Sequence, residues 1–99
     1  MAALFWNSDR RDLTPGTANI GTLRGVIANA IREIGFSQVN QGQLDVSGGK
    51  NGVFVSIAHF PTGNRSFFEV VMAAGESGDL TRSTRDEVVN KLRRLVFFD

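Results

Sequence analysis

Residues 53–74 read VFVSIAHFPTGNRSFFEVVMAA. Two runs rich in β-branched and aromatic residues flank a short segment of turn-forming residues, which is the pattern of a β-hairpin. Because glycine accepts a positive φ, Gly63-Asn64 is predicted to form a two-residue turn. Strands are therefore expected at 53–60 and 66–74.

The expected turn also sets the register of the two strands. It places Thr62 opposite Arg65, so that Phe60 is expected to face Phe67 across the hairpin. One face of the hairpin is then nearly all apolar and is predicted to meet the helices. The other face has no obvious cover and is predicted to be an interface. The residues of this predicted interface are Phe54, Ala58, Phe60, Phe67, Glu69 and Val71.

Helices are predicted on both sides of the hairpin in the sequence. Residues 17–34 carry apolar side chains at helical spacing, and Gly35 is well placed to end that helix. Residues 85–97 follow a capping-box pattern, Thr84-x-x-Glu87, with acidic residues early and basic residues late. That order suits the helix dipole.

The remaining segments complete the predicted fold. A weaker strand is expected at 37–47, with a bulge at Gly42, and residues 47–52 are expected to be a turn. The fold class is therefore α+β: an α-β-β-β-α two-layer sandwich with a three-stranded antiparallel sheet and two helices on one face. Residues 1–16 are predicted to be an N-terminal arm that covers part of the core or docks on a partner. Residues 17–99 are predicted to form a single α+β domain.

The predicted element order resembles that of the double-stranded-RNA-binding domain. Those domains begin their second helix with clustered lysines, whereas this helix begins Thr84-Arg85-Asp86-Glu87. The resemblance is one of topology, and no function follows from it.

Composition narrows the class of protein. The chain has 99 residues, no cysteine and a formal net charge of +1. This length suits one domain, and the absence of cysteine rules out disulfides and thiolate metal sites. The sequence shows no signal-peptide pattern and no apolar run long enough to span a membrane. A cytoplasmic location without membrane association is therefore the expectation.

Few residues offer chemistry. His59 is the only histidine, and in the expected register it faces the core while Glu69 lies on the other face. An acid–base catalyst needs a partner and access to substrate, so no catalytic residue is predicted. No metal or cofactor site is predicted either. Ser47-Gly48-Gly49-Lys50 does not match a phosphate-binding loop, because a strand follows it instead of a helix.

These observations favour a non-enzymatic protein-interaction module, most simply a homodimer formed through the uncovered sheet face. Small residues on the first helix form a second possible interface, at Gly21, Gly25 and Ala28. One alternative is a small-ligand or minor enzymatic pocket between sheet and helices, with His59 or Glu69 at its mouth. Another is weak nucleic-acid binding, which the nearly balanced charge disfavours.

Overall fold

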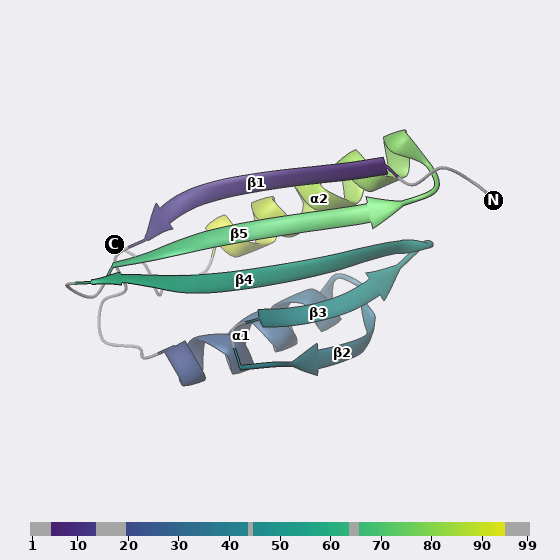
Figure 1. The fold of residues 1–99 in the computed structure, drawn as a ribbon. Coiled ribbons are helices and arrows are strands. Elements are labelled where there is room, and N and C mark those ends of the chain that lie inside the picture. Colours follow the sequence, from purple (N-terminus) through teal and green to yellow (C-terminus); the bar gives the residue numbers. More distant parts are fainter. Residues whose placement is uncertain (1–4, 14–19, 44, 64–65, 95–99) are drawn as a thin grey trace.

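A computed structural model describes residues 5–13, 20–43, 45–63 and 66–94. Within these residues the chain forms one antiparallel sheet with the strand order β1-β5-β4-β3-β2, and two helices. Both helices lie on the same side of the sheet, α2 behind β1 and β5 and α1 behind β3 and β2 (Figure 1). The α+β class is confirmed. The elements are β1 (Phe5–Leu13), α1 (Ile20–Glu33), β2 (Ser37–Gln41), β3 (Asp45–Lys50), β4 (Val53–Gly63), β5 (Ser66–Gly75) and α2 (Gly78–Arg93).

The sheet has five strands where the sequence predicted three. One of the two additional strands is β1, which occupies most of the segment predicted to be an arm and pairs with β5 along its whole length. Its side chains toward the helices include Asn7, Asp9 and Arg11, so β1 shows no apolar alternation. Pairing with β5, and not hydrophobic patterning, is what makes this segment a strand.

The second additional strand arises because the predicted strand at 37–47 is two strands, β2 and β3. The Gly42 amide donates to the Asp45 carbonyl at 2.7 Å and closes a turn between them, where the sequence predicted a bulge. The turn predicted at 47–52 is only two residues long in the structure, Asn51-Gly52, whose φ angles are 53° and 76°. Two successive positive φ angles give a type I′ turn, which joins β3 to β4. With one strand before α1 and four strands between α1 and α2, the element order of the RNA-binding domain does not hold.

The predicted register of the central hairpin is wrong by one residue. The structure places Phe60 opposite Phe68 and Ala58 opposite Val70, with an irregularity between Pro61 and Gly63. That irregularity adds one residue to β4 relative to β5. Because side chains alternate along a strand, the slip exchanges the two faces of β5 and leaves those of β4 unchanged.

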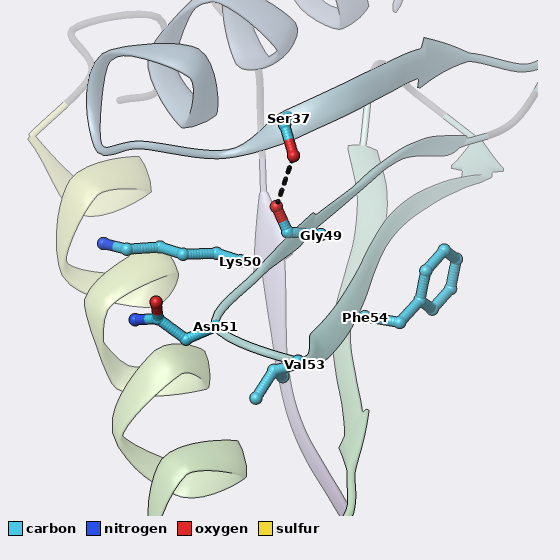
Figure 2. Close-up of a pocket in the computed structure, with 7 residues that line it drawn as sticks. Ser37, Gly49, Lys50, Asn51, Val53 and Phe54 are labelled. Atoms are coloured by element: carbon cyan, nitrogen blue, oxygen red, sulfur yellow. Dashed lines mark hydrogen bonds between the residues drawn. The ribbon is translucent and has the colours of Figure 1, made fainter.

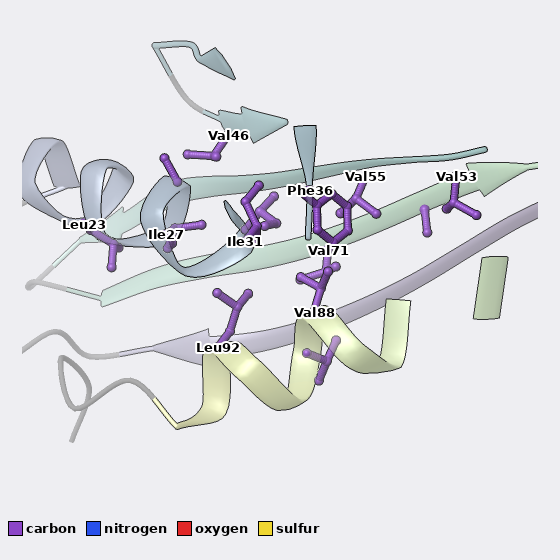
Figure 3. Packing of buried hydrophobic residues seen from close by; sticks show 14 residues of the cluster. Leu23, Ile27, Ile31, Phe36, Val46, Val53, Val55, Val71, Val88 and Leu92 are labelled. Atoms are coloured by element: carbon purple, nitrogen blue, oxygen red, sulfur yellow. The ribbon is translucent and has the colours of Figure 1, made fainter. Parts of the chain in front are cut away.

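The apolar core lies between the helices and one face of the sheet (Figure 3). Ile27 and Ile31 of α1 and Val88 of α2 are fully buried there. The predicted periodicity of both helices is therefore confirmed where it is described. The buried cluster comprises Leu23, Ile27, Ala28, Ile31, Phe36, Val46, Val53, Val55, Ile57, Val71, Ala73, Val88, Val89 and Leu92.

The helix ends agree with the sequence in one case and not in the other. Gly35, with φ 100°, ends α1 as predicted: its amide donates to Arg32 O, and the Phe36 amide donates to Ile31 O. These two bonds form a Schellman motif. In α2, Ser77 is the N-cap and accepts from the Leu80 amide at 3.2 Å. The predicted cap Thr84 is buried inside the helix, so α2 begins earlier than the sequence suggested.

Candidate functional site

Both helices lie on one side of the sheet, and we term the other face the open face (Figure 1). Among the described residues, this face carries most of the exposed large apolar side chains. Residues paired between antiparallel strands project from the same face, so the pairings arrange this face in rows across β1, β5, β4 and β3. The rows are Trp6-Ala74-Phe54-Gly49, Ser8-Met72-Ser56-Ser47, Arg10-Val70-Ala58-Asp45 and, without a β3 member, Asp12-Phe68-Phe60.

Large apolar side chains on the open face remain in contact with solvent. Trp6 is 65% exposed, Phe54 56%, Phe60 42% and Met72 36%. Phe68 is half-buried beneath Arg10, whose guanidinium carbon lies 3.8 Å from the ring centroid in a cation–π contact. A continuous exposed apolar surface of this kind usually marks a binding site.

Half of the predicted interface lies on this face. Phe54, Ala58 and Phe60 of β4 are there, as the sequence predicted. Glu69 and Val71 are not, because each is only 2% exposed and lies under the helices. The register slip explains the position of both residues. The side chain of Phe67 lies outside the described part of the structure.

Sequence reasoning missed the contributions of β5 and β1 to the open face. The predicted register places Phe68, Val70 and Met72 on the face that meets the helices, and Trp6 and Arg10 lie within the predicted arm. In β5 both faces are apolar, so alternation alone does not distinguish them. The described part of the predicted arm lies beside β5 and not over the face: Trp6 extends the open face by one strand, and Phe5 projects from the opposite side.

Two hollows interrupt the surface near Phe54. One, of about 300 Å³, lies between Trp6, Phe54 and Met72, with Asp45 and Ser56 at its polar side. Asp45 Oδ2 accepts a hydrogen bond from Ser56 Oγ at 3.0 Å. The other, of about 320 Å³, lies at the β3–β4 turn and is lined by Ser37, Gly49, Lys50, Asn51, Gly52, Val53 and Phe54 (Figure 2).

Lys50 is engaged within the protein and is not arranged to bind phosphate. Its Nζ atom donates to the Ile34 carbonyl and to Glu87 Oε1, each at 2.6 Å. In Figure 2 its side chain points away from Phe54, toward α2. The segment Ser47–Lys50 is part of β3, which agrees with the rejection of a phosphate-binding loop.

A buried ionic cluster lies on the opposite face, where one residue from each of three adjacent strands meets. Arg11 Nε donates to Glu69 Oε1 at 2.6 Å, and His59 Nε2 lies 2.8 Å from Glu69 Oε2. A carboxylate only accepts, so His59 carries a proton on Nε2. Burial raises the pKa of Glu69, but the hydrogen bonds from His59 and Arg11 and the charge of Arg11 outweigh it, and the pKa is lowered overall.

The imidazole and the carboxylate of the cluster are closed to solvent, whereas Arg11 is partly exposed. His59 is 0% exposed, and its Nδ1 atom has no partner among the described residues. The sequence placed His59 and Glu69 on opposite faces, and this prediction is wrong for the same register reason. The contacts of this cluster link β1, β5 and β4 to one another. In the described ranges, no three His, Asp or Glu side chains converge in a way that would hold a metal ion.

Two residues of the second predicted interface, on α1, are described, and their surroundings differ. Ala28 is fully buried in the core. A Cβ added at Gly25 would meet nothing within 4 Å, so that position faces open space. The surroundings of Gly21 lie outside what the structure describes.

Comparison of the chain with family models, curated proteins and solved structures found no match. Neither described helix is long and apolar enough to cross a membrane.

Proposed function

We propose that this protein is a non-enzymatic interaction module that forms a homodimer by packing the open faces of two copies together. The observation that carries the proposal is the exposure of Trp6, Phe54, Phe60 and Met72 on one face without a helix over it. Burying a large apolar side chain is worth about 1.5–3 kcal/mol, so covering this face would be strongly favourable.

Both edges of the sheet are poorly suited to pairing with another chain, which favours association through the face. The outer edge strand β1 contains the charged run Asp9–Asp12, and Arg85 Nη1 donates to the Ser8 carbonyl at 3.0 Å. The other edge strand, β2, has five residues, and Gln38 within it has a φ of 52°. Charge, backbone capping and irregularity are the usual means of blocking edge-to-edge association.

The charges on the open face disfavour nucleic acid as the partner. Arg10 is its basic residue among the rows described above, and Asp12 and Asp45 are its acidic ones. Aromatic platforms that bind single strands combine stacking with a positively charged groove, and the described residues of this face form no such groove. The enzymatic alternative receives no support from His59 or Glu69, which are buried and line none of the hollows described here.

The available area suits a small interface. With strands about 4.8 Å apart and residues about 3.3 Å apart along them, the four strands and four rows span about 500 Å² on each copy. Two copies would then bury about 1,000 Å², the threshold for a specific interface with good complementarity. Its apolar centre and polar margin have the usual anatomy of such an interface.

Sedimentation equilibrium of the wild-type and variant chains tests the proposal. Wild type should be a dimer, and the double variant Phe54→Ser, Phe60→Ser should be a monomer with an unchanged circular dichroism spectrum. Leu80→Ser is the matched control, because Leu80 is 43% exposed on α2, away from the open face. That variant should remain a dimer. A wild-type chain that is monomeric at high micromolar concentration would rule out self-association.

A further inference from the structure

We propose that the two copies are related by a two-fold axis parallel to the strands, so that Arg10 of each copy faces Asp45 of the other. This inference rests on the proposed function and specifies its geometry. It follows from the order of residues along the rows of the open face.

The geometry follows from the strand order. Four strands, β1, β5, β4 and β3, contribute to the rows, and the midline of this set runs between β5 and β4. A two-fold axis along that midline, between the two facing sheets, brings β1 of one copy over β3 of the other and β5 over β4. Each row then faces itself, with its order reversed. Aligned sheets cross at about −30°, and the axis bisects that angle.

Reversal of the third row makes its charges complementary. Arg10 and Asp45 lie at its two ends, with Val70 and Ala58 between them. In the dimer Arg10 of each copy lies across from Asp45 of the other, and the symmetry produces the pair twice. The ionic contact requires Arg10 to turn away from the Phe68 ring and Asp45 to turn away from Ser56. The apolar pair at the centre of the row separates the two contacts. Opposite charges at these positions also select this orientation over others.

Reversal of the first two rows places large side chains opposite small ones. Trp6 faces Gly49, Phe54 faces Ala74 and Met72 faces Ser56. Gly49 offers space for the indole: a Cβ there would meet only the Val53 carbonyl, at 3.8 Å. The hollow of about 320 Å³ beside it is the second one described above (Figure 2). Alternation of large and small residues is what allows two facing layers to interdigitate.

A two-fold axis perpendicular to the strands fits less well. Placed between the second and third rows, it would bring Trp6 opposite Asp12 and Arg10 opposite Ser8. Asp45 would then face Ser47, so neither Arg10 nor Asp45 would face a counter-charge. Charge therefore favours the axis parallel to the strands, and the pairing of large with small side chains in the first two rows agrees with that axis.

Charge reversal tests this arrangement directly. Arg10→Glu alone and Asp45→Arg alone each create two like-charge contacts, and each should raise the dimer dissociation constant roughly tenfold or more. When the two variants are mixed, both contacts in the heterodimer join opposite charges. A heterodimer should therefore form with nearly the wild-type dissociation constant, and the double variant should form a homodimer. Differently tagged chains distinguish the species.

Filling the hollow provides an independent test. Gly49→Leu should weaken the dimer by at least about tenfold because it occupies the space assigned to Trp6. Gly25→Leu is the matched control, since Gly25 also faces open space but lies on α1. That variant should leave the dissociation constant unchanged.

The outcomes separate the two proposals. A monomeric wild type would contradict self-association itself. If wild type is a dimer that Phe54→Ser, Phe60→Ser dissociates, but the Arg10→Glu and Asp45→Arg variants do not pair when mixed, the open face is the interface and the strand-parallel axis is wrong. Weakening by Gly25→Leu but not by Gly49→Leu would place the interface on α1 and contradict both proposals.

Discussion

Glu69 is the residue whose environment most constrains the fold. An ionised carboxylate that is 2% exposed is costly unless its oxygens are paired. Here one oxygen accepts from Arg11 and the other from His59, and both partners are directly opposite Glu69 in the strand pairings. A shift of either neighbouring strand by one residue would remove one of these contacts. The cluster therefore helps to maintain the register of three strands.

We expect Glu69→Gln to destabilise the folded protein by about 3 kcal/mol. The substitution removes the carboxylate charge that pairs with the Arg11 guanidinium, and a glutamine offers one acceptor oxygen where the carboxylate offers two. Urea denaturation at neutral pH measures the effect. A loss below about 0.5 kcal/mol would show that the cluster contributes little to stability.

The same substitution tests the pH dependence. Because the pKa of Glu69 is lowered in the folded state, the stability it provides is fully present above its ordinary value of 4.5. That stability is lost as the pH falls through the lower, folded pKa. The difference in unfolding free energy between wild type and Glu69→Gln should therefore shrink as the pH falls below 4.5. A difference that grows on acidification would contradict the lowered pKa.

At the scale of elements, the two helices are terminated by different means. Gly35 ends α1 because its φ of 100° suits glycine, and the Schellman bonds satisfy carbonyls of the last turn. The start of α2 depends on a side chain, since Ser77 accepts from the Leu80 amide. Asp79 in the first turn adds a favourable interaction with the helix dipole.

Ser77→Ala should destabilise the protein by about 1 kcal/mol, because the first turn loses its capping acceptor. Ser83→Ala is the matched control: Ser83 lies inside α2, is exposed and bonds only to the Leu80 carbonyl of its own helix. Alanine has the higher helix propensity, so this control should be neutral or slightly stabilising. Thermal unfolding followed by circular dichroism compares the two variants. Equal losses would argue against Ser77 as the cap.

At the scale of the whole molecule, the two faces of the sheet have different roles. One is covered by α1 and α2 and holds the core together with the ionic cluster. The other carries aromatic side chains without a helix over them. A single layer of helices on a five-stranded sheet leaves this asymmetry, and the proposed dimer resolves it by using a second sheet as the cover.

The melting temperature should consequently rise with protein concentration, since dimerisation stabilises only the folded chain. Calorimetry over a hundredfold range of concentration should show this rise for wild type. The Phe54→Ser, Phe60→Ser variant should show no such dependence. A wild-type melting temperature independent of concentration would contradict a dimer that dissociates on unfolding.

Local sequence determined the elements that have local signals. Apolar spacing predicted the buried sides of both helices, β-branched and aromatic runs predicted β4 and β5, and Gly35 predicted the end of α1. The alternation of β4 also placed Phe54, Ala58 and Phe60 on the open face correctly. These features depend on periodicity and on glycine's backbone freedom, which are properties of a short segment.

Only the tertiary structure determines that residues 5–13 form a strand, which register the hairpin takes and which residues lie on the open face. In β5 two alternating faces are nearly equally apolar, because apolar residues occur in neighbouring pairs: Phe67-Phe68, Val70-Val71 and Ala73-Ala74. Glu69 lowers the hydrophobicity of one face, so the pattern favours burying the other face and exposing Glu69, which is wrong. Burying Glu69 becomes favourable only when Arg11, 58 residues away in the sequence, pairs with it. That ionic contact requires β1 to join the sheet. Because the residue that offsets the cost of burying Glu69 is so distant in the sequence, the residues around Glu69 do not reveal it.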